Sequence, residues 1–203
     1  MDKERTALLT RRRVLPLPVA LLIAACGGRT AMTEAPKVID DLSQPHPAAR
    51  NGADWRLVAD TVMGGNSEGR MRREVVAGRA ALHMTGDVSL ANNGGFLQLA
   101  LDLAPDGEAV DARAWTGIEI DVFGDGETYN LHLRTTDLWL PWQSYRQNFD
   151  APPRWTTRRL PFADFAPYRT DTPLALNKLR RLGVVAIGRA FQPDIAIGGV
   201  RFY

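Results

Sequence analysis

The chain has 203 residues, of which 45% are hydrophobic and 24% charged, with a formal net charge of +2. These values are typical of one globular domain that buries a sizeable core. The positive charge is concentrated in residues 1–25, where five basic and two acidic residues give +3, so the remainder carries −1. A nucleic-acid-binding protein needs a basic face on its folded part. The overall charge therefore gives no support to nucleic acid as a partner.

The N-terminal segment has the layout of a bacterial export signal. Residues 11–13 are three arginines, and they precede a short apolar stretch, residues 14–25, that ends in small residues. The arginines resemble the twin-arginine export motif. The apolar stretch is shorter than the roughly 20 residues of a comfortable membrane span. We therefore predict a signal peptide over residues 1–25.

Residues 23–26, Ile-Ala-Ala-Cys, resemble a bacterial lipobox. Cys26 is the only cysteine, and in this interpretation it is the lipidated first residue of the mature protein. A spanning anchor or a fortuitous cysteine is the alternative. We expect a membrane-anchored lipoprotein of the bacterial cell envelope that faces the periplasm.

Residues 26–52 are predicted to form a tether between the lipid and the domain. They lack apolar periodicity, and prolines recur at positions 36, 45 and 47. Only Val38 to Leu42 could form a first edge strand. The folded domain is expected over residues 53–203.

From residue 53 onward, apolar side chains recur with period two, which predicts half-buried β-strands. The expected strands are residues 55–58, 71–76, 80–84, 97–103, 118–122, 129–133, 143–149, 156–161, 182–187 and 195–203. The dipeptide Ala77-Gly78 joins the second and third of them, and a turn around Phe162–Phe165 is the best helical candidate. Short strands at this spacing predict an all-β fold, either a β-sandwich or a barrel.

The dipeptide Asp125-Gly126 predicts a β-hairpin between residues 118–122 and 129–133, because Asp-Gly is a strong signal for a two-residue turn. In the matching register Val122 opposes Tyr129, and every apolar pair lies on one face. The same register places Glu119 opposite His132 on the polar face.

Two glycine-rich loops, residues 60–67 and 92–96, are expected to shape the backbone. Glycine adopts positive φ without steric cost and lets strands approach closely. Asp60 is expected to bond the backbone of its own loop, and oxygen ligation of calcium is the alternative. The residues that we assign to these loops are Asp60, Gly64, Gly65, Ser67 and Gly95.

The chain contains no HExxH, CxxC, Walker lysine or GxSxG motif, and its three histidines, His46, His83 and His132, lie far apart in the sequence. Glu119 and Asp121 share one strand face at about 6.6–7 Å, which is within the carboxylate spacing of inverting glycosidases. Such a pair is more often a solvated face or part of a binding groove than a catalytic pair. We therefore predict no enzymatic activity, no cofactor and no metal.

An aromatic cluster is the best candidate for binding. Trp139, Trp142 and Tyr145 lie within seven residues, among polar side chains. Aromatic rings with planar polar partners suit sugar rings or a protein hot spot, and core packing is the alternative, which fits Tyr145 best. The candidate ligand- or partner-binding residues are Trp139, Trp142, Gln143, Tyr145, Arg146, Glu119, His132 and Arg134.

Several motifs, in chain order, resemble the complex I intermediate-associated protein family. They are residues 60–67, 93–96, 117–126, 129–131, 142–145, 160–165 and 197–203. The resemblance covers residues 53–203 and implies a jelly-roll β-sandwich of the galactose-binding-like type. The family is named after a mitochondrial assembly chaperone for NADH:ubiquinone oxidoreductase. The export signal departs from the mitochondrial pattern, so the resemblance transfers the fold and not the biological role.

Two functional hypotheses follow. The first is a non-catalytic, chaperone-like module that binds a protein partner in the cell envelope. The second is a carbohydrate-binding module of the envelope, and an enzyme that uses Glu119 and Asp121 is a remote third. Aromatic residues on a concave face near Glu119, His132 and Arg134 favour a glycan, whereas a flat apolar patch around Trp139 favours a protein.

Overall fold

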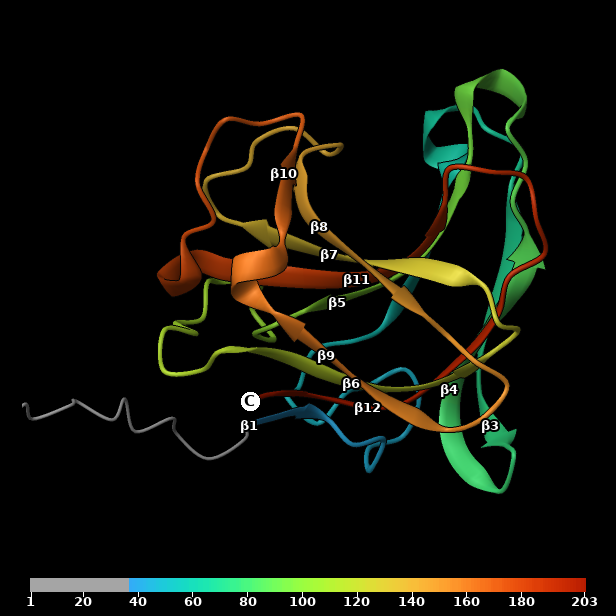
Figure 1. Cartoon of the computed structure of the whole chain (residues 1–203), viewed down its shortest axis with the longest axis horizontal. Helices are drawn as coiled ribbons and strands as arrows, with labels where there is room; N and C mark the ends of the chain where they lie inside the picture. The colour runs from blue at the N-terminus through green and yellow to red at the C-terminus, as the bar shows by residue number, and fades with distance from the viewer. Residues whose placement is uncertain (1–36) are drawn as a thin grey trace, which may run out of the picture. The chain divides into compact units, whose positions relative to one another are not determined.

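The computed structural model describes residues 37–203, which form twelve strands and four short 3-10 helices (Figure 1). The strands are β1 (Lys37–Asp40), β2 (Arg56–Ala59), β3 (Glu68–Val76), β4 (Arg79–Asp87), β5 (Phe96–Asp102), β6 (Gly117–Gly124), β7 (Thr128–Thr135), β8 (Ser144–Asp150), β9 (Thr156–Pro161), β10 (Ala166–Tyr168), β11 (Leu179–Ile187) and β12 (Asp194–Phe202). The 3-10 helices are η1 (Asp60–Met63), η2 (Ala91–Asn93), η3 (Phe162–Asp164) and η4 (Leu176–Lys178). The predicted all-β class is confirmed.

The strands form two antiparallel sheets that pack face to face as a jelly-roll sandwich. The first has the order β3-β4-β12-β6-β9, with β1 also paired to β12, and the second has the order β10-β8-β7-β11-β5-β2. One hydrophobic cluster lies between them, built from alternate residues of the strands, such as Ile120 and Leu131, which are fully buried.

Most predicted strands lie within a few residues of the observed ones, and β9 has the predicted bounds. The predicted β3–β4 connection is confirmed, because Val76 pairs with Arg79 and both Ala77 and Gly78 have positive φ. A two-residue type I′ turn requires this conformation. The short strand β10 was not expected from the sequence.

The predicted hairpin at Asp125-Gly126 is wrong. β6 pairs with β12 and β9, whereas β7 pairs with β11 and β8, so the two strands belong to different sheets. Their apolar sides face each other across the core, which produces the same alternation as a hairpin with one buried face. Gly126 has φ +88°, and its turn carries the chain from one sheet to the other.

The folded unit begins before residue 53. β1 pairs with β12, and Ile39 and Ala49 are buried in residues that we assigned to the tether. The buried carboxylate of Asp40 accepts a hydrogen bond of 2.7 Å from the indole N–H of Trp55. This segment lacks a period-two signal because only a four-residue strand and isolated side chains are inserted into the core. The predicted signal peptide and Cys26 lie outside the described residues. In residues 37–203 no helix is long and apolar enough to cross a membrane.

Candidate ligand-binding groove

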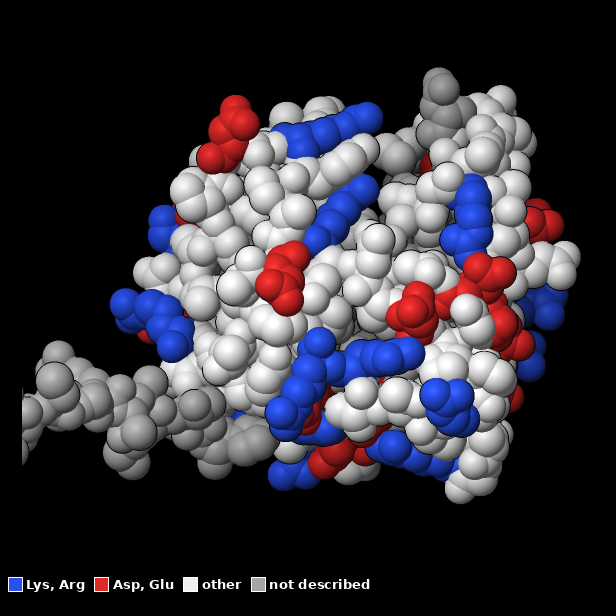
Figure 2. Space-filling model, in the orientation of Figure 1, with Lys and Arg blue, Asp and Glu red and all other residues white. Residues whose placement is uncertain are grey.

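A groove of about 720 Å³ lies on the outer face of the second sheet. Its floor comes from β5, β7, β8 and β11, and its walls are loops at opposite ends of these strands. The loop between β7 and β8, gold in Figure 1, forms one wall, and the teal and green loops around η1 and η2 form the other. The surface is hollowed at the upper edge of the molecule between these two parts (Figure 2).

The centre of the floor is a row of paired residues across four strands. Arg146 pairs with His132, His132 with Gly183, and Gly183 with Ala100. The small residues hollow the floor beside His132. A Cβ at position 183 would come within 2.1 Å of the Gln98 side-chain nitrogen, so glycine lets this amide lie across the sheet.

The tryptophan wall is fixed by Arg134. Its guanidinium donates hydrogen bonds of 2.6–3.2 Å to backbone carbonyls between β7 and β8, namely those of Leu138, Leu140, Pro141 and Gln143. Four bonds from one planar group hold the loop in place above the sheet. Trp139 is 91% exposed and Trp142 is 43% exposed, which leaves both rings accessible at the groove.

The opposite wall is built around the carboxylate of Asp60, which is fully buried. It accepts hydrogen bonds from the N–H groups of Ser67, Gly95 and Phe96 and from the Ser67 hydroxyl. A Cβ at Gly65 would come within 2.4 Å of this carboxyl group, which explains why glycine is needed beside it.

These bonds tie the loop after β2 to the loop before β5. Burial disfavours the charged form of Asp60, but the hydrogen bonds outweigh that effect and lower its pKa. The resulting rigid support carries exposed apolar side chains at the groove, those of Val62, Met63 and Leu90. No cluster of three metal-ligating side chains occurs in the part of the chain that the structure describes.

His132 is the buried polar group at the centre of the groove. It is 8% exposed, and its Nε2 atom has no hydrogen-bond partner. Burial and the neighbouring Arg146 guanidinium lower the pKa of His132 to about 3. The ring is therefore neutral at physiological pH, with one nitrogen a donor and the other an acceptor.

We expect this histidine to make the protein less stable in mild acid. The folded-state pKa is depressed below the ordinary value of 6.5, so the unfolded chain binds more protons below pH 6.5. Between pH 6.5 and 5 this difference should lower the free energy of unfolding by about 1–2 kcal/mol. Urea unfolding across this range is the measurement, and His132→Gln should flatten the dependence.

His83 supplies the control because its pKa shifts in the opposite direction. Burial opposes its charge, but bonds of 2.7 Å to Asp194 and 2.6 Å to Glu74 raise the pKa. The contribution of His83 to the free energy of unfolding is therefore present in acid and is lost as the pH rises above 6.5 and through the raised pKa. His83→Gln should leave the acid dependence unchanged. An equally flat profile for this control would contradict the assignment to His132.

The structure brings together most, but not all, of the candidate binding residues. Those that line the groove are Trp139, Trp142, Gln143, Arg146, His132 and Arg134. Tyr145 points into the core, is 1% exposed and donates its hydroxyl to the carbonyls of Thr172 and Pro173. Glu119 lies on β6 in the other sheet, so its predicted placement beside His132 is wrong for the same reason as the hairpin.

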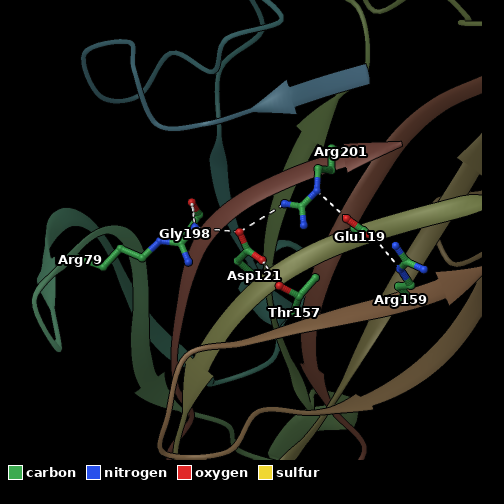
Figure 3. Close-up of polar contacts among 7 residues, drawn as sticks. All are labelled: Arg79, Glu119, Asp121, Thr157, Arg159, Gly198 and Arg201. Atoms are coloured by element: carbon green, nitrogen blue, oxygen red, sulfur yellow. Dashed lines mark hydrogen bonds and ion pairs between the residues drawn. The ribbon is translucent and has the colours of Figure 1, made fainter. Parts of the chain in front are cut away.

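The sequence also predicts that Glu119 and Asp121 lie on a solvated face or in a binding groove. The structure shows neither arrangement for these two residues. They are 6% and 7% exposed and lie beneath arginines (Figure 3). Glu119 bonds Arg159 and Arg201, both at 2.5 Å. Asp121 bonds Arg79 at 2.7 Å, Arg201 at 3.3 Å and the Thr157 hydroxyl at 2.5 Å. Fully paired carboxylates lack the free general acid and base that glycoside hydrolysis needs.

Several groove residues were not identified from the sequence, among them Gln98, Tyr168, Arg169, Arg180 and Gly183. A β-bulge explains one of these omissions. The β11–β7 register shifts between Leu179 and Arg181, so the two successive side chains Arg180 and Arg181 both reach the groove. The available signal was the adjacent pair Arg180 and Arg181, directly before the predicted strand of residues 182–187. Strict alternation along a strand places two successive side chains on opposite faces, so the pair does not predict a shared site.

Comparison with known families gives a match to the model of complex I intermediate-associated protein 30 over residues 41–195. The chain belongs to this family. The match begins after β1 and ends at the start of β12, so it covers every strand of the second sheet and both walls of the groove. A comparison with curated proteins gave no match.

Solved structures with a similar fold include carbohydrate-binding modules. The family 11 module of the cellulosomal cellulase Lic26A-Cel5E of Clostridium thermocellum is 11% identical with a TM-score of 0.64, over 83% of this chain and 94% of that one. The family 11 module from Clostridium thermocellum in complex with a β-1,3-1,4-mixed-linked tetrasaccharide is 12% identical with a TM-score of 0.62, over 82% of this chain and 94% of that one. A family 30 carbohydrate-binding module is 12% identical with a TM-score of 0.55, over 85% of each chain. These likenesses confirm the predicted jelly-roll sandwich fold.

Proposed function

We propose that this protein is a non-catalytic carbohydrate-binding module that holds a glycan chain in the groove of the second sheet. The observation that carries the proposal is the placement of the two exposed tryptophans, Trp139 and Trp142, beside a concave floor with polar groups. Apolar faces of sugar rings stack on such aromatic side chains, while hydroxyl groups bond planar polar partners. The tetrasaccharide held by a family 11 module of the same fold supports this choice of ligand.

Binding to a glycan array by the full-length chain tests this function. Trp142→Ala should remove the signal, because it deletes a ring at the groove without exposing the core. Trp142→Phe should retain most of the signal, since an aromatic face remains. A signal that persists in Trp142→Ala, or the absence of any glycan signal from the unaltered protein, would rule out the groove as a glycan site.

A protein partner is the second candidate, and the exposed apolar side chains favour it. Trp139 and Leu140 at one wall and Val62, Met63 and Leu90 at the other are all at least 44% exposed. Apolar patches on a soluble domain often mark contact surfaces, and the family is named for association with complex I intermediates. Crosslinks from position 139 to one envelope protein, together with a silent glycan array, would select this candidate.

We further propose that the chain is exported and anchored by a lipid on Cys26, so that the groove faces the periplasm. The export-signal layout and the lipobox-like residues 23–26 support this location. The mass of the mature N-terminal peptide is the direct measurement. An unmodified cysteine in that peptide would exclude the anchor.

A further inference from the structure

The groove is lined by basic side chains without acidic ones. Five arginines contribute to it, Arg134, Arg146, Arg169, Arg180 and Arg181, and none of its described lining residues is Asp or Glu. This local charge contrasts with the chain after residue 25, which carries −1 in total. A purely neutral ligand would need no such concentration of charge.

Two of the five arginines are already committed to the structure. Arg181 is paired with Asp102 at 2.6 Å, and Arg134 bonds the carbonyls of the tryptophan wall. The other three, Arg146, Arg169 and Arg180, have no carboxylate within ion-pair distance among the described residues. Arg146 stacks on the Tyr168 ring at 3.4 Å and donates one bond of 2.9 Å to the Ser144 hydroxyl. Stacking fixes the plane of its guanidinium beside the groove.

Buried polar atoms at the groove also lack partners. The Nε atom of Arg180 and the Nε2 atom of His132 are both buried without a hydrogen bond. Buried polar atoms in folded proteins are nearly always bonded, so these two mark positions where a ligand can supply the partner. The β-bulge that turns Arg180 towards the groove places its charge on the same side as Arg181.

We propose that the groove selects an anionic glycan, one whose sugar rings carry carboxylate groups. This inference rests on the proposed glycan-binding function and adds the ligand class. Arginine binds carboxylate through two parallel N–H donors, which gives both direction and strength. The neutral His132 ring offers a donor or acceptor to a sugar hydroxyl, and the tryptophans offer stacking faces. The groove therefore matches the charge, the hydroxyl groups and the apolar ring faces of a polyuronate.

The test compares two forms of one polysaccharide backbone on the full-length chain. Polygalacturonate carries the carboxylates, and its methyl ester has the same backbone without the charge. Isothermal titration should give an affinity for the acid form that is about tenfold or more higher than for the ester. Added salt should weaken binding of the acid form, because screening reduces attraction between charges.

Matched arginine variants then locate the effect. Arg180→Gln should lower the affinity for polygalacturonate about tenfold or more. Arg113→Gln is the control, because Arg113 is an exposed arginine outside the groove, paired with Asp111. It removes the same charge and should change the affinity less than twofold. Because the comparison of acid and ester uses the unaltered protein, a folding defect in one variant does not decide the result.

The outcomes distinguish a failure of anionic selectivity from a failure of glycan binding itself. Equal binding of the ester, or tighter binding of neutral mixed-linkage β-glucan, overturns the anionic selectivity and leaves glycan binding intact. An equal loss in Arg180→Gln and Arg113→Gln also overturns it, since the attraction is then not specific to the groove. The absence of binding to every acidic, esterified and neutral glycan overturns the inference together with the proposed function.

Discussion

Replacing Asp60 with alanine is expected to lower the free energy of unfolding by about 3–5 kcal/mol, since each buried donor left without an acceptor costs about 1–3 kcal/mol. The Asp60 carboxylate accepts from three backbone N–H groups and one hydroxyl in two separate loops. Chemical denaturation of the full-length chain measures the change.

An exposed aspartate provides the comparison for this substitution. Asp171→Ala should change stability by less than about 0.5 kcal/mol, as is usual for surface substitutions. Asp60→Asn keeps the shape but turns an amide donor towards N–H groups, so we expect it to cost nearly as much as alanine. A loss below about 1 kcal/mol in Asp60→Ala would show that the two loops do not depend on this carboxylate. A gain in stability on adding calcium would instead favour the alternative role as an ion ligand.

The second large effect is expected from Arg201→Met, which should lower the free energy of unfolding by about 2–3 kcal/mol. Arg201 lies between Glu119 and Asp121 and bonds both (Figure 3). Without Arg201, the nearly buried carboxylates of Glu119 and Asp121 lose the positive charge between them, so they repel each other more strongly. Methionine retains the aliphatic contact of the side chain, so the measured loss reports mainly on charge.

Arg159 provides a matched control in the same network. It bonds Glu119 as closely as Arg201 does, but its side chain is 69% exposed, against 27% for Arg201. Exposed ion pairs contribute about 0–1 kcal/mol, so Arg159→Met should have a much smaller effect. Adding Glu119→Gln to Arg201→Met should recover part of the loss, because it removes one unpaired charge. Equal losses for the two arginine variants would contradict this account of the network.

The two sheets differ in the outward side chains that they present. In the first sheet, the two outward carboxylates of β6, those of Glu119 and Asp121, are paired with arginines from β4, β9 and β12. Buried polar atoms without a partner occur in both sheets, at Arg73 on β3 and at His132 and Arg180 in the second sheet. The latter two residues line the groove, beside the exposed rings of Trp139 and Trp142 in the loop between β7 and β8. A satisfied polar network contributes to the stability of a fold, whereas an unpartnered polar atom beside an accessible groove can gain its partner from a bound ligand. The groove, with its accessible rings and unpartnered polar atoms, is why we propose binding on the second sheet.

The sequence alone determined the buried face of nearly every strand, because period-two alternation directly reports which side chains leave water. It also determined the family through ordered motifs, and it identified the tryptophan cluster through its unusual density of rings.

Apart from the β3–β4 hairpin, only the tertiary structure decided which strands pair. Alternation specifies a buried face but not the neighbour that shares its backbone hydrogen bonds, so β6 and β7 fit a hairpin and a cross-core packing equally well. That one choice separates Glu119 from His132 by the thickness of the sandwich. A single extra residue at Arg180 likewise reverses which side chains face the groove, and the register that creates this bulge exists only once β11 lies beside β7.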